Sequence, residues 1–301
     1  VFVKTLILCG DFMTKLIFSI FIDTKTNKGK HIETFSKLKE HYNRLVDVKK
    51  QYAKSIGAEY KVFTDDEMWS SFKNRVKDYE FDVLNLYKIY LLEELSKQYD
   101  NVLYMDMDIV PNTNVSIFET FDMNKICVRS INATIDVLPE KMSKHIKSEK
   151  KSYYEIMSQL DKYNEHIKAL QKRAMLINQN IVCNDYEIAN TGIVAGNKSA
   201  IGKLKFTERL DEMLKVLSDT KEECFYGEKI TDYFFANNEI FFHYLLDKYK
   251  VEWFNLPEEW HKIHYTREAN FTPDFKKSHM IHLISKKFDE LWKFLDNVDS
   301  K

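Results

Sequence analysis

The stretch Asn101-Val-Leu-Tyr-Met-Asp106-Met-Asp108-Ile-Val-Pro111 predicts the core of the fold. Residues 101–105 form a short apolar run, which is typical of a strand buried on both faces. Side chains two apart in a strand point to the same side, so Asp106 and Asp108 are expected to project together from its carboxyl end. Open α/β sheets bind ligands at that edge, and a hard divalent cation would relieve the repulsion between two carboxylates.

Upstream of this stretch the chain predicts a β-α-β unit. Residues 15–22 and 60–63 are the expected strands, and the amphipathic helix between them ends at Gly57. That order implies a parallel pair, with Asp23 and Asp65 following the two strands. A second amphipathic helix over 81–98 carries Lys88 and leads directly into the aspartates.

Downstream, polar residues recur where further elements begin or end. Asn190 and Gly192 lie in an expected strand over 186–196, where glycine allows close approach of backbone to a ligand. The run Asn237-Asn238-Glu239 is expected to cap a helix over 240–246. His279 and His282 end a short apolar segment followed by Lys286 and Lys287, so an imidazole could complete a metal site beside phosphate-neutralising lysines.

Residues 139–178 differ from their surroundings because they are rich in lysine and predominantly helical. Apolar side chains repeat with alternating spacings of three and four, as a heptad seam does: Tyr153, Ile156, Leu160, Tyr163, Ile167, Leu170, Ala174 and Ile177. The favoured interpretation is a helical insertion, a hairpin packed on the domain. A lid over an acceptor site and a seam for a homodimer through 139–178 stay open as alternatives.

Composition limits the class of protein. The chain has 301 residues, enough for one large domain or two small ones, and we expect a single domain over 1–301. Its formal net charge of −1 indicates no nucleic-acid role. Its four cysteines form no C-x-x-C pair, so reduced thiols in a cytoplasmic protein are expected. Residues 1–22 are apolar but too interrupted by charge for a transmembrane segment, and residues 1–12 are interpreted as a non-native leader before Met13.

Taken in order, these motifs resemble the nucleotide-sugar-dependent glycosyltransferases of the GT-A fold, and are most similar to the family 8 group of glycogenin and bacterial galactosyltransferases. The resemblance runs from residue 15 to 292 and includes Val102-Leu-Tyr-Met-Asp106-Met-Asp108 and Leu256-Pro257-Glu-Glu-Trp260. It implies an α/β fold, a GT-A (Rossmann-like) mixed sheet flanked by helices. The chain departs from the family at His261, where asparagine is usual, at Ser285, where glycine is usual, and in its Asn-Asn-Glu element.

The resemblance implies a role for each motif. Asp106, Asp108 and His282 would hold Mn²⁺ or Mg²⁺, and the donor would be a nucleotide-sugar, in the first place a UDP-sugar. Positive charge at the diphosphate would come from Lys88, Lys286 and Lys287, contacts to the nucleoside from Asp23 and Asp65, and contacts to the sugar from Asn190 and Gly192. The acceptor would be a glycan, a protein or a lipid-linked molecule.

Glu239 and Asn238 are the expected catalytic residues, and the family points to a retaining reaction in which Glu239 positions the acceptor. An inverting enzyme with Glu239 as base is the first alternative. A sugar-nucleotide pyrophosphorylase is a second, although the glycine-rich phosphate loop that such enzymes need is missing after residue 22. A non-catalytic scaffold that uses the heptad helices is a third.

Overall fold

A computed structural model describes residues 13–23, 30–76, 83–133, 153–220, 224–225, 228–229, 237–264, 275–284 and 286–298. Within these ranges the side chains of 30–34, 83, 153–164, 217–218, 220, 224–225, 228–229, 237 and 298 are left out of the description. The expected leader at 1–12 and residues 139–152 of the expected insertion lie outside the described residues.

The strands are, in chain order, β1 (Lys15–Ile20), β2 (Glu59–Phe63), β3 (Asn101–Met105), β4 (Ile109–Pro111), β5 (Ile126–Asn132), β6 (Glu187–Asn197), β7 (Cys224–Phe225), β8 (Glu228–Lys229), β9 (Trp253–Asn255), β10 (Lys262–His264) and β11 (Met280–Leu283). The predicted strands at 15–22, 60–63 and 101–105 are thereby confirmed, each within a few residues of its expected bounds.

The α-helices are α1 (Lys30–Glu40), α2 (Tyr42–Ser55), α3 (Glu67–Arg75), α4 (Val83–Ser96), α5 (Ile117–Thr120), α7 (Tyr153–Asn178), α8 (Lys198–Gly202), α9 (Phe206–Thr220), α10 (Asn237–Lys248) and α11 (Phe288–Val298). The part of the chain that the structure describes also contains two short 3-10 helices, η2 (Glu258–Trp260) and η3 (Phe275–Lys277). The helix expected before Gly57 is interrupted at His41, and Gly57 follows it with a φ of 65°, as a helix-ending glycine does.

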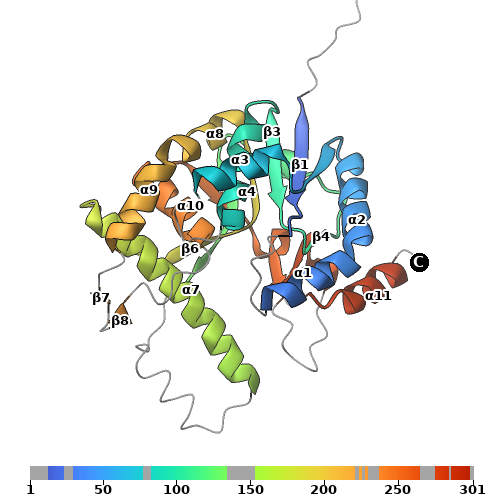
Figure 1. The fold of residues 1–301 in the computed structure, drawn as a ribbon. Helices are drawn as coiled ribbons and strands as arrows, with labels where there is room; N and C mark the ends of the chain where they lie inside the picture. Colours follow the sequence, from blue (N-terminus) through green and yellow to red (C-terminus); the bar gives the residue numbers. More distant parts are fainter. Residues whose placement is uncertain are drawn as a thin grey trace, which may run out of the picture.

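In the described part of the chain, six strands form the central sheet in the order β2-β1-β3-β6-β5-β9 (Figure 1). β1 runs parallel to both β2 and β3, whereas β6 runs antiparallel to β3 and β5. The parallel pair expected from the β-α-β order is confirmed. A smaller sheet, β10-β11-β4, continues from the carboxyl end of β3. Helices flank this mixed sheet, so the predicted fold class is confirmed.

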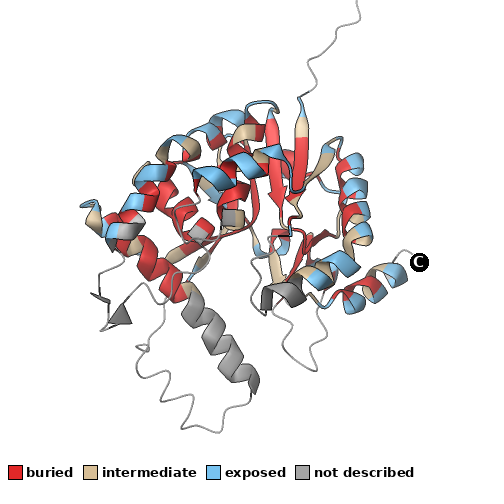
Figure 2. Cartoon of the chain, viewed as in Figure 1, coloured by how far each residue is buried: buried red, intermediate tan, exposed pale blue. Residues whose placement is uncertain are grey.

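The central strands are buried on both faces, as their continuous apolar sequence predicts. Leu16 and Phe18 of β1 pack on one face with residues of α4, α9 and α10. Ile17 points to the other face, where it packs with Tyr52 and Ile56 beside α2. Figure 2 shows the same division, with buried residues gathered in the strands and on the helix faces turned toward them. The rigid edge at which these strands end carries the site described below.

Helix α7 packs against α10, α9 and β6 (Figure 1). Within its described side chains, Ala169 and Met175 are fully buried, but Ile177, the last position of the expected seam, is 44% exposed. The other described seam positions, Ile167, Leu170 and Ala174, are buried, so the expected seam packs on the domain at these positions and not at Ile177. Contact with three neighbouring elements buries a face wider than a two-position heptad stripe, and that face also contains Lys168 and Lys172.

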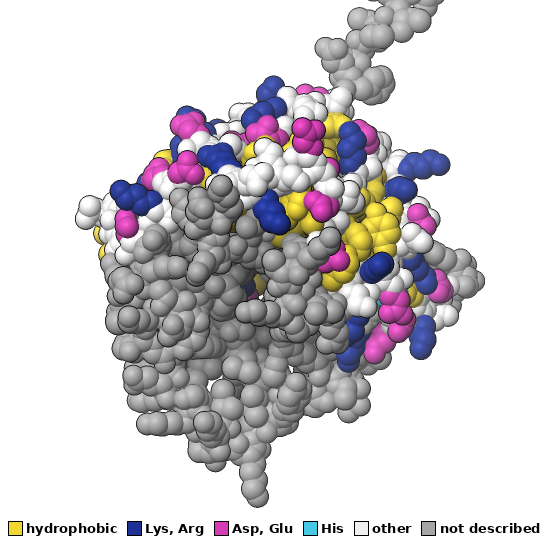
Figure 3. Space-filling model, viewed as in Figure 1, with side chains coloured by type: hydrophobic (Ala, Val, Ile, Leu, Met, Phe, Trp, Pro, Cys, Tyr) yellow, Lys and Arg dark blue, Asp and Glu magenta, His cyan; other side chains and the backbone are white. Residues whose placement is uncertain are grey.

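The surface seen in Figure 3 carries lysine, arginine, aspartate and glutamate side chains interspersed over its described part. No single-sign field covers this view, in keeping with the formal net charge of −1. Among the described residues, no helix combines the length and the apolar character that crossing a membrane requires.

Candidate functional site

A turn at the carboxyl end of β3 brings Asp106 and Asp108 together. β3 ends at Met105, and Ile109 N donates to the carbonyl of Asp106 at 3.1 Å, which closes a turn around the two aspartates. The backbone N–H of Asp106 donates to the carbonyl of Gly192 at 2.9 Å. The expected proximity is found, but the expected reason is wrong, because a turn and not the pleat of a strand places the carboxylates.

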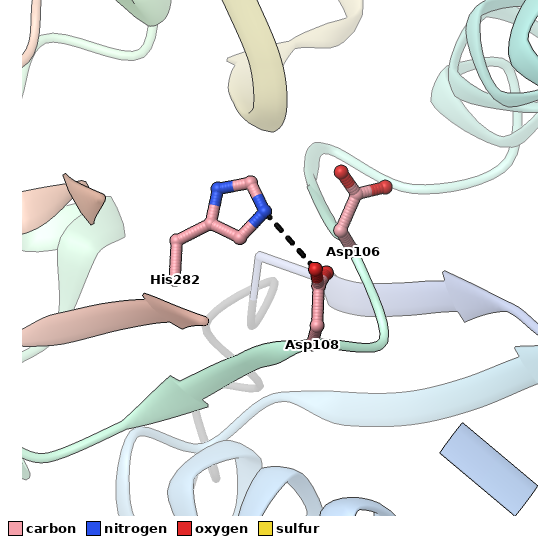
Figure 4. Close-up of side chains that lie close together, drawn as sticks. All are labelled: Asp106, Asp108 and His282. Atoms are coloured by element: carbon pink, nitrogen blue, oxygen red, sulfur yellow. Dashed lines mark ion pairs between the residues drawn. The ribbon is translucent and has the colours of Figure 1, made fainter. Parts of the chain in front are cut away.

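His282 joins this pair from β11. The antiparallel register of β11 on β4 sets His282 opposite Ile109, immediately after Asp108. Ligand atoms of Asp106, Asp108 and His282 all lie within 4.8 Å of one another. Figure 4 shows the three side chains converging, with His282 Nε2 3.3 Å from Asp108 Oδ2. The sheet edge therefore gathers two carboxylates and one imidazole into a single cluster.

Two lysines balance the charge of the aspartates. Lys88 of α4 is buried with its Nζ 3.6 Å from Asp106 Oδ1, and Tyr104 Oη donates to the same oxygen. Lys286 Nζ donates to Asp108 Oδ2. Burial opposes ionisation of Asp108, but Lys286 and His282 outweigh it and hold the pKa of that carboxyl well below its usual value. Asp108 is therefore a carboxylate throughout the physiological pH range.

Lys49 lies beneath the turn and was not expected from the sequence. It is fully buried, and its Nζ donates to the carbonyl of Met107, between the two aspartates, at 2.9 Å. Burial lowers the pKa of Lys49 to about 7, against the attraction of Asp108 and Asp106. The sequence did contain a sign of this burial, because Lys49 lies on the apolar face of its helix, between Leu45 and Tyr52.

Strand β6 supports the imidazole through Gly192. A Cβ on Gly192 would lie 2.8 Å from His282 Cε1 and 3.0 Å from its Nδ1, so only glycine lets the ring pack this closely. Asn190 Oδ1 accepts from Gly192 N at 3.0 Å. The register of β5 on β6 shifts between Val128 and Arg129, opposite this segment of β6. Asn190 and Gly192 thus lie beside the cluster, in the strand that the sequence predicted over 186–196, and their expected contacts to the sugar stay predictions.

His261 is a second buried side chain near the cluster that was not expected there, since the sequence marked it only as a departure from the family. It is fully buried, and its Nε2 lies 3.0 Å from His282 Nδ1. Burial, together with the neighbouring His282, holds the pKa of His261 well below its usual value. His261 is therefore a neutral imidazole, available to exchange a hydrogen bond with the imidazole of the cluster.

Helix α10 continues the site along β6. It begins at Asn237, so Asn238 and Glu239 belong to its first turn and do not precede it as a cap. Asn238 Nδ2 donates to Thr191 Oγ1, next to Gly192. Glu239 is buried with its Oε2 2.5 Å from Lys168 Nζ of α7. Burial opposes the charge of Lys168, but Glu239 and Glu165 outweigh it and raise the pKa of this lysine above its usual value.

Three expected site residues have no described contact that joins them to this cluster. Asp23 and Asp65 follow β1 and β2, whose parallel pairing puts both residues beyond the same sheet edge, and both are exposed. Lys287 is exposed next to Lys286. Their expected contacts to nucleoside and diphosphate stay predictions.

A second acidic group, Cys183, Asp185 and Asp247, also has ligand atoms within 4.8 Å of one another. Here the cation is already supplied by the protein. Lys172 Nζ lies 2.8 Å from Asp185 Oδ1 and 2.8 Å from Asp247 Oδ2, and its side chain is fully buried on α7. This group is a buried ion-pair network that joins α7 to α10.

The first cluster differs in ways that suit a metal ion. Its lysines contact one carboxylate each, and Lys286 lies in a turn after β11 and not within a helix. Oxygen donors with one imidazole nitrogen form a donor set that Mn²⁺ and Mg²⁺ accept. The residues present therefore fit a divalent cation held by Asp106, Asp108 and His282.

The sequence matches no family model and no curated protein. Solved structures that resemble the chain include a glycosyltransferase involved in glycosylation of the major capsid of PBCV-1, with 10% identity over 92% of this chain and 98% of that one, at a TM-score of 0.42. Mouse xyloside xylosyltransferase 1 shares 11% identity over 90% and 98% of the two chains, at 0.45. The galactosyltransferase LgtC shares 9% over 90% and 87%, at 0.41. Likeness at this level leaves the chemistry of this chain to be argued from its own residues.

Proposed function

We propose that this chain is an enzyme, a metal-dependent glycosyltransferase of the GT-A type, similar to family 8. It would move a sugar from a nucleotide-diphosphate donor, in the first place a UDP-sugar, to the hydroxyl of a glycan, protein or lipid-linked acceptor. One observation carries the proposal. The carboxylates of Asp106 and Asp108 and the imidazole of His282 converge within 4.8 Å at a sheet edge, with a lysine beside each aspartate.

The chain's own residues divide the work of binding the donor. Asp106, Asp108 and His282 would hold Mn²⁺ or Mg²⁺, which when bound stabilises negative charge on the departing diphosphate. Lys88 and Lys286 lie beside the same carboxylates, so their ammonium groups can donate to phosphate oxygens. Lys287 would add positive charge next to Lys286.

The remaining expected residues surround the rest of the donor. Gly192 lets the backbone of β6 approach closely, and Asn190 already orients that backbone through its side chain. Both would face the sugar. Asp23 and Asp65, beyond the ends of β1 and β2, would contact the nucleoside.

A retaining reaction is the stereochemistry that the site supports better. Glu239 is buried and its Oε2 already accepts a hydrogen bond from the ammonium group of Lys168, so this oxygen is not open to take a proton from an acceptor hydroxyl. An inverting enzyme needs a strong base at the acceptor, whereas in retention the leaving phosphate can take the acceptor proton. Glu239 and Asn238 would then position the acceptor.

Two further parts of the proposal concern the molecule's surroundings. A homodimer through 139–178 would use the part of that segment outside the packing of α7 on α9 and α10, and sedimentation at micromolar concentration would detect it. A cytoplasmic location is supported by the described cysteines, Cys127 and Cys183, which are free thiols.

The test is binding of donor in the presence of metal. UDP-glucose, UDP-galactose, GDP-mannose and dTDP-glucose are each added with Mn²⁺, and thermal unfolding is followed. One of them is expected to stabilise the protein by about 2.7 kcal/mol at about 100 times its Kd. Asp108→Asn should abolish that stabilisation. Asp185→Asn, a carboxylate of the second acidic group, is the matched control and should keep it.

Release of free sugar and nucleotide from the donor, measured by chromatography, then separates an enzyme from a binding protein. A protein that no nucleotide-sugar stabilises in the presence of Mn²⁺, or an Asp108→Asn variant that binds donor as the wild type does, would contradict the proposed function.

A further inference from the structure

An arginine lies on β5 opposite the part of β6 that supports the cluster. Residues 126–128 of β5 are fully buried and apolar, and Arg129 follows them with a side chain that is only 20% exposed. The register jumps at this point, because Val128 pairs with Val194 but Arg129 pairs with Asn190. Irregularities of this kind re-aim a side chain, and residues directly opposite in an antiparallel pair share one face of the sheet. Arg129 and Asn190 therefore lie on the same face.

The guanidinium group of Arg129 connects this face to the cluster. Its Nη1 donates to the backbone carbonyl of His261, whose imidazole lies 3.0 Å from His282 Nδ1. The other nitrogen of His282, Nε2, is the one that faces Asp108. Arg129 thus approaches the cluster from the side of the imidazole, whereas the two lysines of the cluster contact its carboxylates.

The protein compensates the charge of Arg129 only weakly. Among the described residues, the one carboxylate within 4.0 Å belongs to Glu258, whose Oε2 is 4.0 Å from Nη2 and so beyond hydrogen-bond length. Glu258 is exposed, and its other oxygen accepts from Lys262. Burying most of a guanidinium group destabilises the fold unless its N–H groups find acceptors. A neutral donor would serve the His261 carbonyl at lower cost, so the charge is better explained by a ligand.

Asn190 adds further donors beside this guanidinium group. Its Oδ1 accepts from Gly192 N at 3.0 Å, and its Nδ2 has no partner within the described part of the chain. The groups left open here, guanidinium and amide N–H, can only donate. A surface of donors alone is complementary to a group that only accepts, and the planar fork of arginine matches the oxygens of a carboxylate or a phosphate.

We propose that Arg129 is a specificity-determining residue that binds an anionic group, a carboxylate or a phosphate, on the transferred sugar or on the acceptor. The inference rests on the proposed function, because Asn190 and Gly192 are the residues expected to face the sugar. The diphosphate is expected beside the metal ligands and their lysines, so the anion at Arg129 is a second one. A uronic acid is the simplest sugar of this kind, since it carries a carboxylate where a hexose has a hydroxymethyl group.

Three variants test the inference. Arg129→Gln keeps an N–H donor for the carbonyl of His261 and removes the charge. Glu258→Gln removes the neighbouring carboxylate, which competes with an anionic ligand for the arginine. Arg75→Gln is the matched control, because Arg75 also donates to a backbone carbonyl, that of Thr207 at 2.7 Å, and lies 3.6 Å from an exposed carboxylate.

Calorimetry measures binding in two arms. The donor arm compares UDP-glucuronate with UDP-glucose, and UDP-galacturonate with UDP-galactose, each with Mn²⁺. The acceptor arm compares methyl glucuronide with methyl glucoside, and a glucose phosphate with glucose, both with and without UDP and Mn²⁺. The members of each pair differ only in the anionic group, so the ratio of their Kd values reports the preference for an anion.

In one arm, wild type and Arg75→Gln should bind the anionic member at least about tenfold more tightly than its neutral partner, as expected for charge-assisted hydrogen bonds. The ratio should fall close to one in Arg129→Gln and rise in Glu258→Gln. The arm in which the preference appears identifies which molecule carries the anion. A preference that persists in Arg129→Gln would overturn the inference. Equal weakening of anionic and neutral donors in that variant would overturn it too, because the arginine would then serve the diphosphate or the fold.

The inference and the proposed function fail in different ways. If UDP-sugars bind with Mn²⁺ but neither arm shows a preference for the anionic member, the inference is wrong and the proposed donor site stands. If the acceptor arm shows a preference that depends on Arg129 while no nucleotide-sugar binds with Mn²⁺, the proposed donor site is wrong and the anion site stands. If no compound binds in either arm, both are wrong.

Discussion

Lys49→Met tests what it costs to bury an amine under the Asp106–Asp108 turn. The Lys49 side chain is fully buried and donates to the carbonyl of Met107. Burial lowers its pKa from 10.5 to about 7, against the attraction of Asp108 and Asp106. At about 1.4 kcal/mol for each pH unit, the difference corresponds to about 5 kcal/mol of free energy of unfolding. Methionine fills the same space and carries no charge.

The sign of the effect follows from proton binding. The unfolded chain holds the proton of Lys49 more tightly than the folded chain, so protons favour unfolding. This destabilisation is complete below about pH 7 and fades as the pH rises toward 10.5. The variant loses the hydrogen bond to Met107, which costs about 1–3 kcal/mol at every pH. The free energy of unfolding of Lys49→Met minus that of the wild type should therefore be about 4 kcal/mol larger at pH 6 than at pH 10.

Urea unfolding of metal-free protein at pH 6, 8 and 10 measures this difference. Lys50→Met is the matched control, because Lys50 is the exposed neighbour on the same helix and should show a difference that hardly changes with pH. The same Lys49→Met variant should bind Mn²⁺ more weakly, since the turn has lost its support from below. A stability difference between Lys49→Met and wild type that stays constant from pH 6 to pH 10 would refute the reasoning.

Other predictions concern the residues around the aspartates. Lys286→Gly removes the ammonium group from Asp108, at a backbone φ of 58° that glycine adopts freely. The variant should bind Mn²⁺ without nucleotide about tenfold more tightly and the donor more weakly. Calorimetry that shows no gain in Mn²⁺ affinity would contradict this prediction. Gly192→Ala should cost about 1–3 kcal/mol in urea unfolding, because the new methyl group meets an imidazole, whereas Gly202→Ala has open space and should cost less than about 0.5 kcal/mol. Glu239→Gln should keep substantial turnover with a retained anomer by NMR; a loss of about three orders of magnitude, roughly 4 kcal/mol of barrier, together with an inverted product, would overturn retention.

Local patterns in the sequence predicted the elements well and the partners of each side chain poorly. The apolar run before Asp106 predicted a buried strand, because burial on both faces leaves a continuous stretch of large apolar residues. That the aspartates meet at a turn follows from where β3 ends, which depends on its pairing with β6. The approach of His282 depends on the register of β11 on β4, and no spacing in the sequence encodes that.

Buried polar residues were the hardest to predict. Lys49 interrupts an apolar helix face, which indicates burial, but its partner is a backbone carbonyl 58 residues away. His261 was visible only as a departure from a motif, and its contact with His282 arises from the pairing of β10 and β11. In α7 the heptad pattern predicted a narrow seam, whereas contact with three elements buries a broader face that includes two lysines.

Those two lysines fix how α7 is turned about its own axis. Lys168 meets Glu239 and Lys172 meets Asp247, about one turn further along α7 and about two turns further along α10. An α-helix rotates by about 100° for each residue, so one residue added between Lys168 and Lys172 would swing one ammonium group away from its carboxylate. That charge would then face apolar neighbours or solvent. Length changes between related chains should therefore accumulate before this half of the helix, where they leave the phase of its lysines unaltered.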